Sequence, residues 1–343
     1  MTPHYIQRTF TALILLLTLS FAACKKEIPR PEPLPDTHSP YITRVLEYLP
    51  AVGQFTNILP KYEEGDTQED MNRKALDELK DNKGGLVTLG GWGGYIVVGF
   101  DHTITNVAGK RDFRVLGNAF YSSSNKEAFE AGSCEPGIIM VAYDANHNGR
   151  PDEDEWYEIA GSAHVDPTQE PWYAFLKSHA PQADLHSYRD FEMTYYRPAK
   201  EPESNEVWST YIRWQDNKGH SGYKVKNQFH AQPYFPQWVK GDKLTFRGTR
   251  LPQNGYNQSS ESPYYVQCKF RYGYADNASN DSKDATIDID WAVDKQGRKV
   301  HLPGVDFIKI YTGVNQENGN LGECSTEISG IADLHLLKED LPN

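Results

Sequence analysis

Short runs of β-branched and aromatic residues, broken by glycine pairs and polar turns, constrain the fold of this chain more than any other feature. Short strands at such spacing are typical of antiparallel sheets, so we predict a mainly β protein with an antiparallel β-sandwich. The runs are LVTLGGWGGYIVVGFDH (86–102), DFRVLGNAFY (112–121), GIIMVAYD (137–144), WYEIAGS (156–162), YYVQCKFRYGY (264–274), TIDIDWAV (286–293) and DFIKIYTGV (306–314).

One segment near the start of the domain has the pattern of a helix instead. In QEDMNRKALDELK (68–80), apolar residues recur at helical spacing, and Asp66 or Thr67 can cap the first turn. The predicted buried face carries Met71, Ala75 and Leu79. We therefore predict one short N-terminal helix.

The region 163–264 differs from the rest in its density of proline, histidine and aromatic residues. It is too aromatic to be a disordered linker. We predict a β-sandwich domain over 41–343 that carries a large aromatic-rich insertion or subdomain at about 163–264.

The N-terminus has the organisation of an export signal. Arg8 precedes an apolar run at 10–23, which is too short to span a membrane and is followed by Cys24. This pattern resembles a bacterial lipobox, which implies a signal peptide at 1–23 and lipidation of Cys24; the alternative is an ordinary signal peptide cut nearby. Alternating prolines at 24–40 predict a semi-rigid tether that holds the domain off a membrane.

The chain is acidic, with a formal net charge of −12 and no basic cluster. That balance argues against nucleic acid or anionic lipid as a partner. Beyond Cys24 there are three cysteines, Cys134, Cys268 and Cys324, and no C-x-x-C spacing that would predict zinc. They allow one disulfide, and the sequence does not choose among the pairings.

The stretch DANHNGRPDEDE (144–155) has the ligand register of an EF-hand calcium loop. Its predicted ligands are Asp144, Asn146, Asn148, the backbone carbonyl of Arg150, Asp152 and Glu155. A strand pattern precedes the loop, so we predict a structural Ca²⁺ site and not a helix-pair sensor. The alternative is an Asx-rich β-turn that binds no ion.

A second acidic group follows later in the chain and is a candidate for a second cation site. Its members are Asp276, Asp281, Asp284, Asp288 and Asp290. In an extended IDIDW strand, Asp288 and Asp290 would share one face. The alternatives are a solvated acidic face, which we favour, and a paired-carboxylate hydrolase site, which nothing in the sequence marks.

No recognisable catalytic motif accompanies these groups. The chain has no Gly-x-Ser-x-Gly elbow, P-loop, dinucleotide fingerprint or His-Glu-x-x-His pair. We therefore expect a protein that is not an enzyme.

Aromatic residues interleaved with polar ones predict a ligand surface in the 163–264 region. Rings suit the apolar faces of sugars, and amides and carboxylates suit hydroxyl groups. The residues predicted to contact a ligand are Trp172, Tyr196, Trp208, Trp214 and Trp238. The alternative is that these rings pack in the core.

Four segments resemble a group of Bacteroidota cell-surface lipoproteins often labelled PKD-domain or cell-surface proteins. They are GGYIVVGFDHTITNVAGKRDFRVLGNAF (93–120), EPGIIMVAYDANHNGRPDEDEWYEIAGS (135–162), TIDIDWAVDKQGRKVHLPGVDFIKIYTGVN (286–315) and GECSTEISGIADLHLL (322–337). DFRVLGNAF and EPG are also similar to galactose-binding-like sandwiches, which implies a jelly-roll core, structural calcium and Glu135 as a further cation ligand.

The resemblance implies a lipid-anchored, surface-exposed outer-membrane protein that accompanies a TonB-dependent importer. By that likeness the expected function is capture of a nutrient, either a glycan or a corrinoid such as vitamin B12. The alternatives are a glycan-active hydrolase and an adhesin or structural surface protein.

Overall fold

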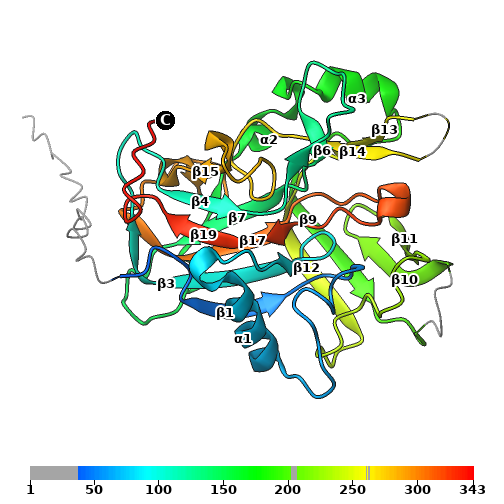
Figure 1. The fold of residues 1–343 in the computed structure, drawn as a ribbon, viewed down its shortest axis with the longest axis horizontal. Coiled ribbons are helices and arrows are strands. Elements are labelled where there is room, and N and C mark those ends of the chain that lie inside the picture. Colours follow the sequence, from blue (N-terminus) through cyan, green and yellow to red (C-terminus); the bar gives the residue numbers. More distant parts are fainter. Residues whose placement is uncertain (1–37, 202–206, 260, 262) are drawn as a thin grey trace, which may run out of the picture. The chain divides into compact units, whose positions relative to one another are not determined.

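The computed structural model describes residues 38–343 except 202–206, 260 and 262 (Figure 1). The predicted signal peptide, Cys24 and nearly all of the tether lie outside the described residues. The described chain is mainly β, with 36% strand and 12% helix, and its sheets are antiparallel, which confirms the predicted class. None of its helices is both long and apolar enough to cross a membrane.

A six-stranded sheet forms the centre of the molecule, in the order β1-β3-β17-β7-β8-β16. Its strands are β1 (Arg44–Leu49), β3 (Tyr95–Thr105), β17 (Gly304–Thr312), β7 (Gly137–Ala142), β8 (Trp156–Ile159) and β16 (Ala292–Val293). Strand β17 pairs with both β3 and β7, so that Ile308 lies between Val98 and Val141. These β-branched residues are fully buried, as the apolar runs predict.

A second layer packs on the inner face of this sheet and closes the main core. It contains the sheet β15-β4-β19, the pair β18-β2 and helix α1. Their bounds are β15 (Thr286–Ile287), β4 (Phe113–Leu116), β19 (Gly330–Asp333), β18 (Glu327–Ile328), β2 (Val87–Thr88) and α1 (Gln68–Leu79). The predicted helix is confirmed, with Thr67 as its capping residue and Met71, Ala75 and Leu79 buried.

Two further four-stranded sheets flank the central layers (Figure 1). The first, β11-β10-β9-β12, comes wholly from the 163–264 region and has its own aromatic core. Its strands are β9 (Tyr188–Tyr196), β10 (Trp208–Asp216), β11 (Ser221–Lys226) and β12 (Lys243–Arg250). The second, β13-β14-β6-β5, contains β13 (Gly255–Asn257), β14 (Tyr265–Cys268), β6 (Ala131–Ser133) and β5 (Phe120–Tyr121).

Short helices fill the connections. They are η1 (Lys80–Asn82), α2 (Ser162–Val165), η2 (Pro167–Gln169), α3 (Tyr173–His179), η3 (Lys283–Ala285), η4 (Ile289–Trp291) and η5 (Gly319–Leu321). The described residues form four sheets of three or more strands. Their strand orders establish an antiparallel β fold without defining a two-sheet jelly roll.

The predicted continuous strand TIDIDWAV is wrong. Strand β15 stops at Ile287, η4 follows, and β16 resumes at Ala292. The Asp288 carboxylate accepts a hydrogen bond from Asp290 N at 2.8 Å, which caps η4 and turns the chain out of the extended conformation.

All three cysteines of the described chain are buried free thiols. The disulfide that Cys134, Cys268 and Cys324 allow in sequence is therefore not formed. Burial raises the pKa of each thiol, which keeps it protonated and unreactive.

Candidate functional site

The candidate site is a cavity of about 680 Å³ between the sheet β13-β14-β6-β5 and the segment 318–327. A cavity of this size fits a small molecule or an oligosaccharide end. Its lining residues come from segments far apart in sequence: Gln54, Phe55, Leu59, Leu86, Asn118, Phe120, Ser122, Gly132, Ser133, Glu135, Phe229, His230, Tyr264, Tyr265, Val266, Gln267, Asn318, Leu321, Glu323, Ser325 and Glu327.

Exposed apolar side chains surround this cavity. Phe120, Phe229, Tyr264 and Leu321 are 59%, 60%, 48% and 54% exposed, and all four line it. Leaving rings in water is unfavourable, and a cluster of them beside a hollow is typical of a binding surface. The cavity therefore has walls suited to the apolar face of a ligand.

Carboxylates form its polar side. Glu323, Ser325 and Glu327 alternate along one extended segment, so their side chains share a face, and all three line the cavity. Glu135, two residues after the end of β6, meets this segment directly. Oxygens of Glu135, Glu327 and Asp276 all lie within 4.8 Å of one another.

Hydrogen bonds hold Glu135 in place. Its Oε1 accepts from Gln267 Nε2 and from Ser325 N, each at 3.0 Å, and its Oε2 accepts from Ser133 Oγ at 3.2 Å. Burial nevertheless outweighs these contacts and raises the pKa of the Glu135 carboxyl to about 7.

Glu327 is held more loosely. In the described part of the chain, its side chain accepts two hydrogen bonds, from Thr88 Oγ1 at 3.0 Å and from Ser325 Oγ at 2.8 Å, both on Oε1. Burial, and then the neighbouring Glu135 and Asp276, raise the pKa of Glu327 well above its ordinary value.

Asp276 has a structural role behind the cavity. Its Oδ1 accepts from Asn118 N and Ala119 N at 2.8 and 2.9 Å, and its Oδ2 accepts from Glu327 N at 2.9 Å. Three backbone N–H groups thus occupy this carboxylate, which fixes the positions of Glu327 and of the loop before β5. Burial and Glu135 raise its pKa.

Glu323 provides a third carboxyl on another part of the cavity wall. Its Oε1 accepts from Gln54 N at 2.7 Å. Burial, and then repulsion from Glu317, raise its pKa to about 8. At neutral pH the cavity therefore holds mostly protonated carboxyl groups, which can donate as well as accept hydrogen bonds. Such groups suit a ligand rich in hydroxyls or amides.

The predicted calcium loop lies between β7 and β8. Asp144 accepts from Asn148 N at 3.0 Å and Gly149 N at 2.8 Å, while Asp152 Oδ2 accepts from the amide nitrogens of Asn146 and Asn148. Gly149 has φ +78°, the left-handed turn that the sixth position of such a loop requires.

The far end of the loop is tied to its start. Glu155 accepts from Ala145 N and Asp152 N, each at 3.0 Å, and Arg150 N donates to Asn148 Oδ1 at 2.9 Å. All the predicted side-chain ligands therefore fold into one turn. It is not among the places in the described chain where three carboxylate or imidazole groups converge, so an ion here would need asparagine and backbone oxygens.

The second predicted cation site is wrong as a set of five aspartates, because the structure gives them different partners. Asp276 joins Glu135 and Glu327 instead, and Asp281 is exposed. Asp284 pairs with Lys269, Asp288 caps η4, and Asp290 accepts from Asn106 and His301.

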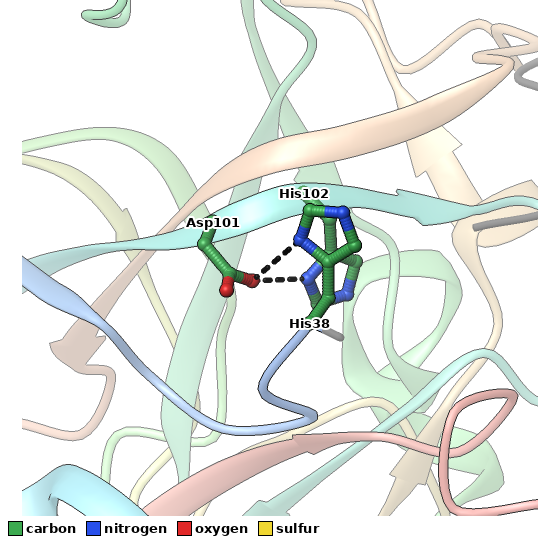
Figure 2. A group of neighbouring side chains, drawn as sticks. All are labelled: His38, Asp101 and His102. Carbon is green, nitrogen blue, oxygen red and sulfur yellow. Dashed lines mark hydrogen bonds and ion pairs between the residues drawn. The ribbon is translucent and has the colours of Figure 1, made fainter. Parts of the chain in front are cut away.

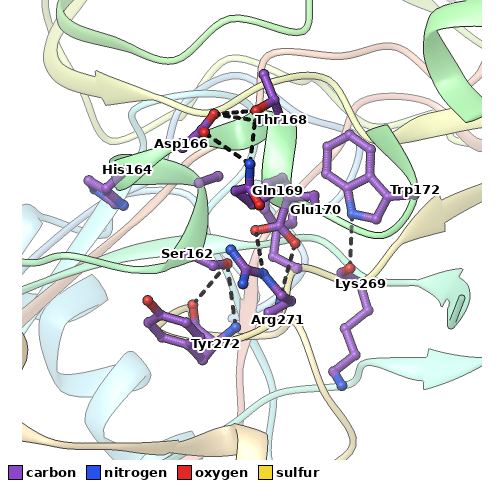
Figure 3. Close-up of polar contacts among 12 residues, drawn as sticks. Ser162, His164, Asp166, Thr168, Gln169, Glu170, Trp172, Lys269, Arg271 and Tyr272 are labelled. Carbon is purple, nitrogen blue, oxygen red and sulfur yellow. Dashed lines mark hydrogen bonds and ion pairs between the residues drawn. The ribbon is translucent and has the colours of Figure 1, made fainter. Parts of the chain in front are cut away.

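For two of the five predicted ligand-binding rings, the prediction of a ligand contact is wrong, because they are core residues. Trp172 is fully buried, packs edge-on against Phe270 and donates from Nε1 to the Lys269 carbonyl at 3.0 Å (Figure 3). Trp238 is stacked on Tyr48, and its indole donates to Gln68 Oε1 at 3.1 Å.

The other three rings lie partly exposed on the β9–β10 strands. The Arg213 guanidinium lies 4.6 Å from the Tyr196 ring centroid, and Trp214 covers Gly222. Trp208 packs on Tyr211. None of the five predicted rings lines the cavity.

The carboxylates of the cavity were mostly missed from sequence. Glu135 was expected as a cation ligand only because of a resemblance to galactose-binding-like sandwiches. Neither Glu323 nor Glu327 was predicted to be a site residue. The alternation E-x-S-x-E at 323–327 is the one local signal that could have placed two carboxyls and a hydroxyl on one face.

No model of a known protein family and no curated protein matches this chain.

Proposed function

We propose that the protein is a non-enzymatic binding protein that captures a small polar nutrient in the carboxyl-lined cavity. Of the two expected nutrients, we favour a glycan over a corrinoid. The observation that carries this proposal is the combination of exposed rings at the rim with buried, largely protonated carboxyls inside. Rings match the apolar face of a sugar, and neutral carboxyls bond hydroxyls without the desolvation cost of a buried charge.

The test is a calorimetric binding screen of glycans and cobalamin, followed by product analysis of the same mixtures. Phe229→Ala should weaken binding by about tenfold, the loss of roughly 1.4 kcal/mol of ring contact. Tyr223→Ala is the matched control, because Tyr223 is 46% exposed but does not line the cavity. Equal affinity in wild type and Phe229→Ala would place the ligand elsewhere.

A glycan-active hydrolase is the second candidate. It is favoured by the proximity of the Glu135 and Glu327 carboxyl groups, whose oxygens lie within 4.8 Å of each other. A carboxyl with a pKa near 7, next to another carboxyl, has the properties of a general acid. Cleaved products that disappear in Glu135→Gln would establish this reaction and exclude simple capture. Host-protein binding with no small-molecule affinity would instead favour an adhesin.

We also propose that the 144–155 loop binds a structural Ca²⁺. The register of its oxygens and the left-handed Gly149 support this. Saturating calcium at about 100 times the dissociation constant should stabilise the fold by about 2.7 kcal/mol, measured as a rise in melting temperature that EDTA reverses. Asp144→Ala should abolish the rise, whereas Asp281→Ala, an exposed aspartate outside the loop, should retain it. An EDTA-insensitive wild type would make the loop a simple turn.

The cellular setting remains part of the proposal. Lipidation at Cys24, outer-membrane surface exposure, partnership with a TonB-dependent importer and membership of the Bacteroidota lipoprotein group are supported by the sequence pattern alone. The jelly-roll core belongs here too, supported by the packing of the six-stranded sheet on a second antiparallel layer.

A further inference from the structure

Two histidines and an aspartate converge where the chain enters the domain, remote in sequence from the calcium loop and the cavity carboxylates. His38 lies just before β1, while Asp101 and His102 are neighbours on β3 (Figure 2). His38 Nδ1 is 3.4 Å and His102 Nδ1 is 2.9 Å from Asp101 Oδ1. The three ligand atoms all lie within 4.8 Å of one another.

The far side of the His102 ring is fixed by a second carboxylate. His102 Nε2 lies 2.9 Å from Asp333 Oδ2, and Asp333 Oδ1 accepts from His335 N at 2.7 Å and Leu336 N at 3.2 Å. A neutral His102 that donates from Nε2 to Asp333 has its lone pair on Nδ1, directed at Asp101. This carboxylate–histidine arrangement is the one that orients metal-binding histidines.

Such an arrangement needs a positive charge at its centre. With the His102 proton on Nε2, the His102 Nδ1 lone pair and the Asp101 carboxylate oxygen repel each other unless a proton or a cation lies between them. Tetrahedral Zn²⁺ with bonds of about 2.0–2.1 Å holds neighbouring ligand atoms about 3.3 Å apart. The separations of 3.4 and 2.9 Å between Asp101 Oδ1 and the two imidazole nitrogens therefore need adjust by less than about half an ångström.

The burial of the three side chains fits an ion that enters from solvent. The His102 side chain is fully buried, while those of His38 and Asp101 are 27% and 39% exposed. One side of the group is thus open to water, which can supply a fourth ligand. Two imidazole nitrogens and one carboxylate oxygen form a donor set that prefers borderline transition metals to Ca²⁺ or Mg²⁺.

We propose that His38, Asp101 and His102 bind one borderline transition-metal ion, represented by Zn²⁺, with Asp333 orienting His102 from behind. The bound ion joins the segment before β1 to the middle of β3. It thereby fastens the point at which the chain enters the domain to the central sheet, next to the backbone hydrogen bond from Asp333 N to Pro40 O.

The experiment measures metal binding directly, on the purified protein prepared without a histidine tag. Zn²⁺ affinity is determined by competition with a chromophoric chelator in excess Ca²⁺, and Co²⁺ provides the absorption bands of a tetrahedral site. Wild type should bind one ion. His38→Gln should lose at least about tenfold in affinity, the lower limit seen when even an orienting neighbour of a metal ligand is removed.

His301→Gln is the matched control, because His301 is also exposed and lies 3.0 Å from an aspartate, Asp290, without a second histidine in a three-ligand group. It should bind like wild type. Because His38 is at the edge of the domain, an unchanged melting temperature of metal-free His38→Gln separates ligand loss from unfolding. No tetrahedral Co²⁺ spectrum in wild type, or a loss below tenfold in His38→Gln, would overturn the proposal and leave a protonated His102 between two carboxylates.

Discussion

At the scale of single residues, Glu323 couples the cavity to the stability of the fold. Its pKa is raised to about 8 by burial and then by Glu317, against an ordinary value of 4.5. Between these two values the native state holds a proton that the unfolded chain has released. The contribution of Glu323 to stability is therefore most favourable below its ordinary pKa and is lost as the pH rises towards 8.

Glu323→Gln should remove that part of the pH dependence. We expect the variant to gain stability relative to wild type as the pH rises from about 5 to about 9, by an amount on the order of a few kcal/mol. Urea unfolding at both pH values measures this difference. Glu64→Gln changes an exposed glutamate outside the cavity and should leave the change of unfolding free energy with pH as in wild type. If Glu323→Gln showed the same change with pH as wild type, Glu323 would not be the titrating group.

At the residue scale, sequence predicts which side chains meet when they are close together along the chain. The turn at 144–155 is encoded by local spacing, so its side chains meet as expected. The cavity carboxylates come from positions 135, 323 and 327, and Asp276 supports them from behind; only tertiary folding brings 135 and 276 to the 323–327 segment. Trp172 illustrates the opposite error, because an indole that finds a backbone acceptor can be buried as readily as a phenyl ring.

At the scale of elements, the glycines between β2 and β3 allow two backbone segments to approach closely. A Cβ on Gly94 would lie 2.0 Å from both Ala51 N and Leu89 O, on the hydrogen bond that joins these two atoms. Only a residue without a side chain fits there.

Gly94→Ala should therefore destabilise the protein by about 3 kcal/mol, the upper end of the usual cost of overpacking, because neither backbone segment can move without losing that hydrogen bond. The free energy of unfolding in urea measures the effect. Gly241→Ala is the control, since the nearest atom to its new Cβ would be 3.6 Å away. Similar values for the two variants would show that the contact at Gly94 relaxes easily.

Element prediction was good for strands with continuous apolar runs and poor where a polar side chain redirects the backbone. Strand β7 lies within its predicted run, and β3 and β17 overlap theirs but extend beyond them, to Thr105 and back to Gly304, because pairing with a sheet neighbour continues there. TIDIDWAV has the same alternation, but Asp288 bonds its own backbone and ends the strand. Periodicity alone does not distinguish an aspartate facing solvent from one that caps a turn.

At the scale of the whole molecule, one buried ion pair joins the outer aromatic sheet to the wall of the cavity. Lys224 on β11 is 5% exposed and pairs with Glu317, whose side chain is 38% exposed, close to Glu323. Burial opposes the charge on Lys224, yet Glu317 and its other neighbours raise its pKa, so the pair is intact across the neutral range.

Lys224→Met should destabilise the protein by about 2–3 kcal/mol at neutral pH. This is below the 3–5 expected for a fully buried pair, because water reaches Glu317. The double variant Lys224→Met/Glu317→Gln should recover part of the loss, as measured by a double-mutant cycle of urea unfolding. Strictly additive losses would mean that the two charges are not coupled.

Strand β17 gives this architecture a consequence for biosynthesis. It is the inner partner of both β3 and β7, yet it is synthesised long after either of them, with strands β8 to β16 in between. Until residue 312 has been synthesised, the facing edges of β3 and β7 remain unpaired on a growing chain, and free edges recruit other strands. The cavity wall at 318–327 arrives later still. The nascent polypeptide thus needs protection until β17 emerges, and no deletion that removes β17 should yield a soluble product.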